Sequence, residues 1–482
     1  MGFIYGLAVI LVIFEGIIIQ CEGGGVFSSN RRQDTRQAEL FLPNDLIELI
    51  VSKTDYKTIK QAVRWGITPP TDLVISRILE NHIIVIKPDE FDGGIHEYYQ
   101  HGDLFLRFGV YSELIAFFNR FGDKVKKIEF DDRLDENDVQ DNEMHTNIIN
   151  HIKSCAKNLD ELRIRAYDYE GFWKDISDGE NGIVFPKVKK FELEGDSKQE
   201  NFKLNVVFPQ LESVALLGEV VDLDCLTNVT GLKELTLTIR TMEGDQLEDI
   251  FKNNKYMTKI ALGPETARTA QWIAEHLKEL KTLDVIFPGE NFLLRTNNDT
   301  VYELSSVTTL NIFMDEEDEI VEIGNFSFNM PNLERLTVFG FHVTDDRIVN
   351  FINHFKKLET VELFQEGYNA IKYIDKLERI KEFTTFIYKV DFDSLRNMFD
   401  RIDENSTLQT LTLVYWNPPL HQNYKNIIER INNHLEKSWT LSHGKEIGTN
   451  INYFIFRREP CIMPMRVLQL SYFAIEVFDS NI

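Results

Sequence analysis

An apolar pattern with a fixed internal spacing recurs along most of this chain and limits the folds it can adopt. Each copy has three apolar residues, the first and second separated by two residues and the second and third by one. From Val188 to Leu358, successive copies start 23, 21, 25, 23, 27, 26 and 25 residues apart. This period predicts a stacked solenoid, in which each unit buries its apolar side chains against its neighbours. The copies start at Val125, Leu159, Val188, Leu211, Leu232, Met257, Leu280, Val307, Leu333, Leu358 and Leu408.

The pattern also predicts the secondary structure of each unit. The second and third apolar residues alternate across one position, so they face the same side of a short β-strand. Segments after several copies have apolar residues at helical spacing instead. These segments are 245–256, 267–280, 345–358, 391–403 and 424–439. Alternation of strands and helices indicates an α/β solenoid over residues 125–456.

This repeat resembles that of the leucine-rich-repeat family, whose members fold into a horseshoe-shaped solenoid and bind ligands on its concave surface. Proteins of that family usually carry Asn or Cys three residues after the third apolar residue, where the side chain bonds to backbone groups of the turn. Here those positions are Tyr167, Asp196, Glu219, Arg240, Glu265, Pro288, Asp315, Phe341, Glu366 and Trp416. Because no Asn or Cys occupies them, the repeats are expected to be irregular.

Composition favours a globular interaction protein. The chain has 482 residues, is 43% hydrophobic and carries a net charge of −25, which argues against nucleic acid or an anionic membrane as partner. Acidic runs at 131–143 and 315–319 are interpreted as solvated loops. The four cysteines, at positions 21, 155, 225 and 461, form no C-x-x-C pair. This low number favours a reducing compartment.

The N-terminus suggests a different compartment. Residues 3–14 are apolar and small residues follow at 23–25, as in a secretory signal. No Lys or Arg precedes the apolar run, however, and Glu15 interrupts it. Residues 1–25 are therefore either a signal peptide or an extension, and the apolar run is too short to span a membrane.

Residues 40–82 predict a small helical module. Pro43 suits the first position of a helix, and a second helix is expected from Asp55 and a third over 71–80. An L-P-x-D opening and a terminal Trp resemble a degenerate F-box. In that family the helices bind the adaptor subunit of a cullin-RING ubiquitin ligase, while C-terminal repeats hold the substrate. The matching residues are Leu42, Pro43, Asp45, Leu46, Ile50 and Trp65.

The match to the F-box family has one departure, because Gln61-Ala62-Val63-Arg64 replaces the usual Val-Cys before Trp65. The alternative interpretation is a helical cap that shields the first repeat from water. Residues 83–124 are interpreted as a connector or N-terminal cap. The tail 457–482 is left unassigned as either a C-terminal cap or a disordered segment.

Catalytic and metal-binding motifs do not emerge from the sequence. His96-Glu97-Tyr98-Tyr99-Gln100-His101 resembles H-E-x-x-H, but its second His stands at i+5, where zinc binding on a helix requires i+4. No phosphate-binding loop, G-x-S-x-G motif or Cys/His metal spacing occurs. We therefore expect no catalytic residues, no metal and no cofactor.

The position after the third apolar residue predicts a partner site. It changes from charged residues in the first repeats to Phe313, Phe339 and Phe364 further on. On the concave surface these three rings would stack as an exposed ridge, and exposed aromatic patches often mark binding sites. Serine at Phe339 and Phe364 would then abolish partner capture at little cost in stability. The alternative is that the rings pack on each other or beneath a loop.

Two functions follow as hypotheses. The first is a cytoplasmic or nuclear substrate receptor, in which the F-box-like module binds a ligase adaptor and the repeats bind a protein target. The second is a secreted leucine-rich-repeat protein of recognition or adhesion, with residues 40–82 acting only as a cap. Neither function requires catalysis by this chain.

Overall fold

One long β-sheet dominates the part of the chain that the structure describes. The structure is a computed structural model and describes residues 76–87, 95–100, 103–132, 142–166, 183–194, 203–218, 223–239, 246–263, 267–286, 301–313, 328–339, 347–364, 376–386, 407–416, 439–445 and 451–458. The chain divides into two units, residues 1–47 and 48–482. All described residues belong to the second unit.

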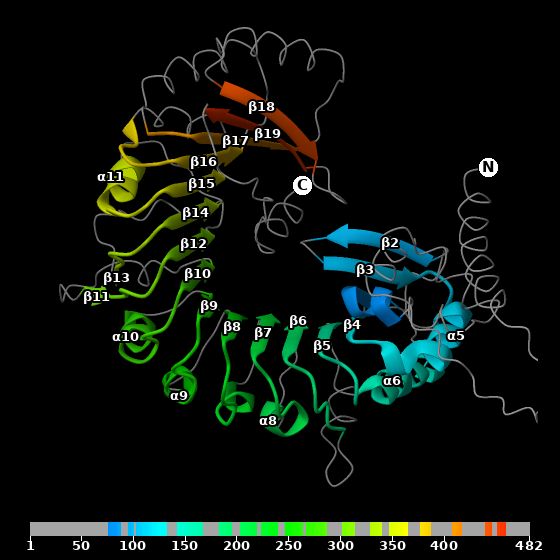
Figure 1. The fold of residues 1–482 in the computed structure, drawn as a ribbon. Helices are drawn as coiled ribbons and strands as arrows, with labels where there is room; N and C mark the ends of the chain where they lie inside the picture. The colour runs from blue at the N-terminus through cyan, green and yellow to red at the C-terminus, as the bar shows by residue number, and fades with distance from the viewer. Residues whose placement is uncertain are drawn as a thin grey trace, which may run out of the picture. The chain divides into compact units, whose positions relative to one another are not determined.

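The sheet has seventeen strands, and fourteen of them are neighbours that run parallel to one another (Figure 1). In spatial order the parallel strands are β3 (Asp103–Phe108), β1 (His82–Ile86), β4 (Lys127–Asp132), β5 (Glu161–Ala166), β6 (Lys190–Glu194), β7 (Ser213–Gly218), β8 (Glu234–Ile239), β9 (Lys259–Leu262), β10 (Thr282–Ile286), β12 (Thr309–Phe313), β14 (Arg335–Phe339), β15 (Thr360–Phe364), β16 (Glu382–Phe386) and β17 (Thr410–Trp416). Antiparallel strands flank both ends: β2 (Ile95–Gln100) beside β3, and β19 (Ile451–Arg458) with β18 (Trp439–Lys445) beside β17.

The sheet is the α/β, solenoid-like stack that the repeat predicts. Each of the eleven copies of the pattern lies on a strand, and the second apolar residues pair across neighbours, as Ile128 with Leu162 and Leu336 with Val361. The first apolar residue of every copy is at most 3% exposed. Burying each such side chain contributes about 1.5–3 kcal/mol. One repeated apolar triplet therefore fixes both the strand register and the face that is buried.

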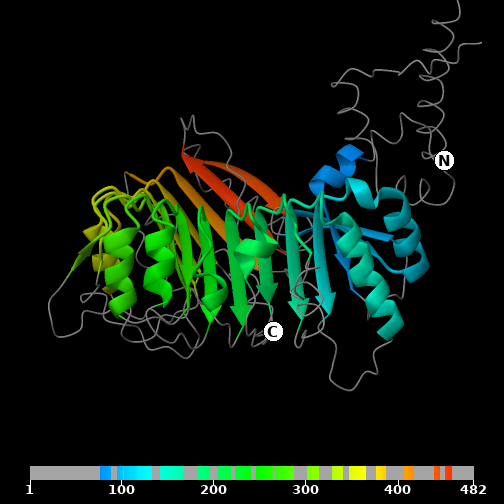
Figure 2. The ribbon, with the colours of Figure 1, turned by 90° about the horizontal axis from the view of Figure 1, so that it is seen from below.

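Helices cover one face of the sheet and complete its core. They are α5 (Tyr111–Phe121), α6 (Asn142–Cys155), α8 (Leu204–Val207), α9 (Gln246–Asn253), α10 (Ala267–His276) and α11 (Arg347–His354), all on the same side in Figure 2. Leu247, Ile250 and Phe251 of α9 share the main core cluster with Leu235 and Leu237 of β8. The helices expected at 245–256, 267–280 and 345–358 are thus present as α9, α10 and α11. Those expected at 391–403 and 424–439 lie outside the described residues.

The sheet begins earlier than the repeat pattern indicated. Residues 83–124 contribute β1, β2, β3 and α5, and β1 inserts between β3 and β4. Ile84 pairs with Ile128, so β1 has the apolar register without a recognisable first apolar residue. Residues 76–81, within the third helix expected at 71–80, are helical. Ile78 and Leu79 of that helix belong to the main core cluster, so this segment packs into the core of the sheet.

A further repeat near Ile380, which matches the apolar pattern poorly, precedes β17. In β16, Phe383 pairs with Val361 and Leu411 at the second apolar position, whereas Thr385 takes the third. Thr385 is 1% exposed although it is polar. A single Thr at an apolar position accounts for the poor match.

The turns before the strands are held by a repeated backbone interaction. At each turn one carbonyl accepts hydrogen bonds from two consecutive amides of the next turn, as Lys233 O does from Thr258 N at 2.8 Å and Lys259 N at 3.1 Å. This arrangement continues from Lys126 O to Lys381 O. Backbone groups at this edge are therefore satisfied without side chains.

Asparagine has a role at these turns that the sequence motif did not indicate. The side chain of buried Asn254 donates to Val229 O at 2.8 Å and accepts from Leu232 N at 2.9 Å. Asn158 and Asn332 similarly donate to carbonyls of the preceding turn. Asparagines thus bridge neighbouring turns before the strands. Of the positions where the leucine-rich-repeat family has its Asn or Cys, all but Trp416 lie outside the described residues.

Candidate functional site

The face of the sheet opposite the helical core carries the side chains that repeat with the strands, and we call it the second face. Its side chains form rows because the strands are in register. The middle row comprises Glu129, Arg163, Glu192, Ala215, Thr236, Ala261, Asp284, Asn311, Thr337, Glu362, Thr384 and Thr412. None of these residues belongs to the main core cluster.

Two further rows flank the middle row. The first row comprises Lys127, Glu161, Lys190, Ser213, Glu234, Lys259, Thr282, Thr309, Arg335, Thr360, Glu382 and Thr410. All of them except Glu161 are at least partly exposed, so the first row is accessible to a partner. The third row runs through Asp131, Arg165, Glu194, Leu217 and Thr238, and then through Ile286, Phe313, Phe339 and Phe364.

At β4 to β6 the second face holds a buried charge network centred on Arg163. The Arg163 side chain is 3% exposed, and its Nη2 lies 2.5 Å from Asp103 Oδ2. Its Nε lies 2.7 Å from Glu161 Oε1. Glu129 and Glu192, on the strands either side, each place a carboxylate oxygen within 4 Å of this guanidinium. Carboxylates thus surround the cation and compensate its loss of water.

Arg165 extends this network by one position along β5. Its guanidinium lies 3.6 Å from Glu129, 3.9 Å from Glu192 and 3.5 Å from Glu194. Two arginines of the central strand therefore share the carboxylates of both neighbouring strands. On the other side of Arg163 lies the ring of Phe105, 5.8 Å from the guanidinium carbon. Phe105 belongs to a small apolar cluster with Ile83 and Val85, so the network has an apolar boundary at β1 and β3.

The carboxylates of this network differ in how well they are compensated. Burial raises the pKa of Glu129 to about 6, although Arg165 and Arg163 favour its charged form. Its Oε2 and Glu192 Oε1 are buried without a hydrogen-bond partner. Burial also opposes the charged form of Glu161, but Lys190 and Arg163 outweigh it and hold the pKa below its ordinary value. Glu129 is therefore less stabilised as an anion than Glu161.

From β12 to β16, aromatic rings take the third-row positions that charged residues hold at β4 to β6. Phe313 and Phe339 stack with ring centres 5.1 Å apart and planes at 11°, and Phe339 and Phe364 at 4.3 Å and 10°. Phe386 continues the row by its backbone register with Val414. The stacking expected of the three rings is present. Their expected exposure is wrong, because Phe313, Phe339 and Phe364 are 1%, 4% and 1% exposed. The rings have the buried, mutually packed arrangement of the alternative interpretation.

The middle row keeps two buried acids at this aromatic end, Asp284 and Glu362. Burial raises the pKa of Asp284, which is 3% exposed. Asn311 Nδ2 donates to Asp284 Oδ1 at 2.6 Å, and Lys259 Nζ lies 3.4 Å from Oδ2. Both partners favour the charged form. Asp284 therefore has hydrogen-bonded compensation that Glu129 Oε2 lacks.

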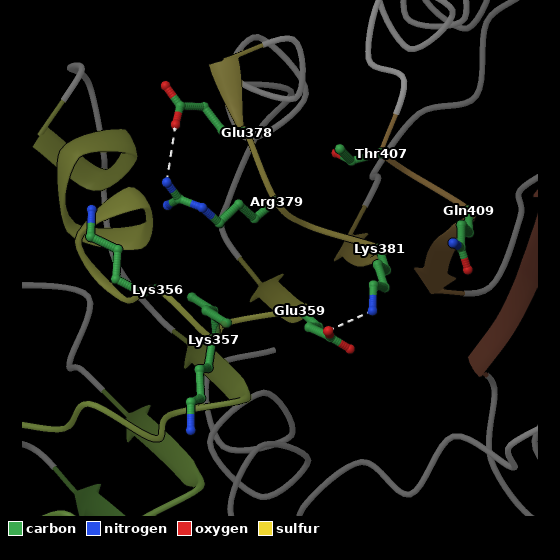
Figure 3. A pocket seen from close by; sticks show the side chains of 9 residues that line it. Lys356, Lys357, Glu359, Glu378, Arg379, Lys381, Thr407 and Gln409 are labelled. Carbon is green, nitrogen blue, oxygen red and sulfur yellow. Dashed lines mark hydrogen bonds and ion pairs between the residues drawn. The ribbon is translucent and has the colours of Figure 1, made fainter.

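A second accessible surface lies where the strands begin. Lys356 and Lys357 lie in the turn before β15, and Arg379 and Lys381 lie in the turn before β16 (Figure 3). With Glu359, Glu378, Leu358, Thr407 and Gln409 they line a pocket of about 370 Å³. Figure 3 shows Arg379 directed toward Glu378, 3.6 Å away, and Lys381 toward Glu359, 2.5 Å away.

The structure does not describe the residues expected to bind a ligase adaptor. Leu42, Pro43, Asp45, Leu46, Ile50 and Trp65 lie outside the described residues, as does the leader 1–25. His96 and Glu97 lie on strand β2, whereas an H-E-x-x-H zinc motif needs a helix. Within the described residues, no group of three or more His, Cys, Asp or Glu side chains is arranged to hold a metal. Nor do these residues include a helix long and apolar enough to cross a membrane.

Comparisons with known proteins assign no family to this chain. No family model matches it, and no curated protein matches it significantly. Among solved structures, it is similar to the crystal structure of a protein from Bacteroides fragilis, determined as a structural genomics target. That similarity has a TM-score of 0.32 and 11% sequence identity, and covers 44% of this chain and 67% of the other.

Proposed function

We propose that this chain is a non-catalytic protein-binding scaffold of the leucine-rich-repeat type, and that it binds its target with the second face of the sheet. The observation that carries the proposal is the first row. Its side chains lie in register on successive strands and remain accessible from Lys127 to Thr410, apart from Glu161. A protein surface of regularly spaced, chemically varied side chains on a rigid backbone suits recognition of another protein.

The rigidity of this face supports the proposal. Beside the first row, in the middle and third rows of the same face, the charge network and the aromatic stack are buried and packed, so neither has to become ordered when a target binds. Binding then costs less conformational entropy than it would on mobile loops. The aromatic rings act in this proposal as a support for the accessible row, and they contact a target directly only if binding uncovers them.

We further propose that residues 40–82 bind the adaptor of a cullin-RING ligase, which makes the chain a substrate receptor of cytoplasm or nucleus. The support is the F-box-like set Leu42, Pro43, Asp45, Leu46, Ile50 and Trp65, placed before the repeats. The buried thiol of Cys155 is free, as is usual in a reducing compartment. The alternative is a secreted recognition protein, in which this module only caps the sheet. Burial of Ile78 and Leu79 in the core favours a capping role for its last helix.

One experiment with three variants tests both parts. The full-length chain, tagged at its C-terminus, is purified from cells and its stoichiometric partners are quantified. Thr282→Arg with Thr309→Arg adds charge and bulk to the first row. Gln271→Arg with Asn350→Arg adds the same groups to exposed positions on the helices and serves as the matched control. Leu46→Arg alters the F-box-like module.

The target is expected with the wild type and the control, and to be lost from the first-row variant. A target retained equally by both double variants would overturn binding through the second face. The ligase adaptor is expected with every protein except Leu46→Arg. Recovery of the chain from the medium, trimmed near Gly25, would instead overturn the ligase role and support the secreted alternative.

A further inference from the structure

The N-terminal edge of the sheet has the opposite charge to the rest of the chain. Each repeat contributes one segment to this edge. The segment is the six residues that immediately precede the second apolar residue of the repeat. These segments are 122–127, 156–161, 185–190, 208–213, 229–234, 254–259, 277–282, 304–309, 330–335, 355–360, 377–382 and 405–410. They hold seventeen Lys and Arg against ten Asp and Glu, a net charge of +7. Because the whole chain carries −25, the remainder carries −32.

The positive charge of this edge is available to a ligand. Lys157, Lys281 and Lys356 are exposed, and they have no acidic partner within the described residues. Lys357 donates to a neutral group, Asn332 Oδ1, at 2.6 Å. Backbone amides of the turns are already paired with the neighbouring turn, so a ligand at this edge meets side chains rather than main chain. Recognition there would rest on charge.

At the pocket before β15 to β17, four cations of this edge line a cavity. Lys356, Lys357, Arg379 and Lys381 supply four positive charges, against Glu359 and Glu378. The two acids are each engaged by one cation, so Lys356 and Lys357 have no acidic partner among the residues that the structure describes (Figure 3). A cavity of about 370 Å³ has room for one or two carboxylate side chains of a bound segment.

Screening decides whether the local or the total charge governs binding. At physiological ionic strength the Debye length is about 8 Å, so charges further from the pocket contribute little. Twelve turns spaced about 4.8 Å apart extend the edge well beyond this length. A ligand at the pocket therefore meets a locally positive surface despite the net charge of −25.

From these observations we propose that the N-terminal edge, centred on the pocket before β15 to β17, binds an acidic segment of a protein partner. A peptide fits better than a nucleic acid, because the pocket lining has no aromatic side chain on which a base could stack. An extended acidic segment can also reach successive turns along the edge. The last residue of each edge segment also belongs to the first row, but none of the residues that line the pocket does. The inference therefore goes beyond the proposed function.

The test measures binding of a fluorescent deca-glutamate peptide to the full chain by anisotropy. The edge variant is Lys356→Glu with Lys357→Glu and Arg379→Glu. Its matched control, Arg120→Glu with Lys203→Glu and Lys252→Glu, changes net charge equally at exposed positions outside the edge. The edge variant is expected to bind about tenfold more weakly or worse, and the control within about twofold of the wild type. Circular dichroism checks that all three proteins are folded.

Several outcomes would overturn the proposal. Equal weakening by the edge variant and the control would show that total charge governs binding. If deca-glutamine bound as tightly as deca-glutamate, charge would have no role in recognition. If a ten-nucleotide RNA bound more tightly than the peptide, the partner would be a nucleic acid rather than a protein. If sedimentation showed that the chain self-associates and deca-glutamate did not disturb the association, the edge would be assigned to binding a second copy of the chain. The first-row variant Thr282→Arg with Thr309→Arg leaves every pocket-lining residue in place and should bind the peptide no more weakly than the wild type, so failure of the proposed function remains distinguishable.

Discussion

The two ends of the second face share one backbone register but are stabilised by different interactions. At β4 to β6, buried Arg163 and Arg165 are compensated by carboxylates of the neighbouring strands. From β12 to β15, the third row is a stack of three phenylalanine rings. Both sets of side chains are nearly inaccessible to solvent. The apolar triplets on the other face fix the register at both ends, so the second face is free to vary in chemistry.

This difference predicts how each end responds to substitution. Stacked rings contribute through apolar burial, which depends on volume and hardly on pH. In a buried charge network, the attraction between opposite charges offsets the cost of removing each of them from water. Removing one member therefore leaves the desolvation cost of the others uncompensated. The predictions below use this contrast, beginning with the largest expected effect.

Replacing Phe339 and Phe364 with Ser together is expected to lower the free energy of unfolding by more than about 5 kcal/mol. Each ring lost from a packed site costs about 3–5 kcal/mol, and neighbouring losses are not additive. Since the rings are 4% and 1% exposed, this replaces the sequence-based expectation of a small cost in stability. Urea denaturation measures the change.

A conservative variant separates packing from aromatic contact with a partner. Phe339→Leu with Phe364→Leu keeps most of the apolar volume, and we expect a loss of about 1–3 kcal/mol. If the serine variant instead kept its urea midpoint while partner capture failed, the rings would be an exposed binding ridge after all.

Replacing Arg163 with Met is expected to cost about 3–5 kcal/mol, because Glu129, Glu161 and Glu192 would lose their shared cation in a buried site. The matched control is Lys190→Met, which also removes an ion pair to Glu161, at 3.1 Å. The Lys190 side chain is 41% exposed, so its pair contributes about 0–1 kcal/mol. Thermal and urea unfolding of both variants give the comparison. Equal effects would mean that burial does not distinguish the two cations.

Much of the fold could be predicted from the sequence because one periodic signal determines it. The triplets located eleven strands, and helical spacing located α9, α10 and α11. The pattern fails where a single residue departs from it, as Thr385 does in β16, or where the first apolar residue is lacking, as in β1. In both cases pairing with neighbours holds the strand in place. Such tertiary support leaves no local trace in the sequence.

The candidate site was less predictable. The row of Phe313, Phe339 and Phe364 and its stacking followed from the spacing, but their burial did not, since sequence gives no measure of what covers a face. The charge network was missed because Glu129, Arg163 and Glu192 are about 30 residues apart and meet only through strand register. A search for opposite charges at equal repeat positions would have found it. The basic N-terminal edge would have emerged from charge counted by repeat position rather than over the whole chain.

The smallest of these effects concerns pH, and it tests whether Glu129 is the weak point of the charged end. Its pKa of about 6 in the folded chain exceeds the ordinary value of 4.5, so the folded state holds this proton more tightly than the unfolded state. Stability from this group is therefore full below pH 4.5 and is lost as pH rises through about 6. The shift corresponds to about 2 kcal/mol. Glu129→Gln should remove this decline, so wild type and variant should differ in unfolding free energy between pH 4.5 and 7.

The exposed Glu279→Gln variant controls for loss of one negative charge. Asp284→Asn provides the same comparison at the aromatic end, where burial also raises the pKa of the acid but Lys259 and Asn311 oppose the shift. We expect a pH-dependent difference of the same sign for Asp284→Asn, because burial raises the pKa of Asp284 as it raises that of Glu129. Parallel pH profiles for wild type and Glu129→Gln would show that the arginines compensate Glu129 fully. The two ends of the second face would then differ in their side chains but not in how completely their buried charges are balanced.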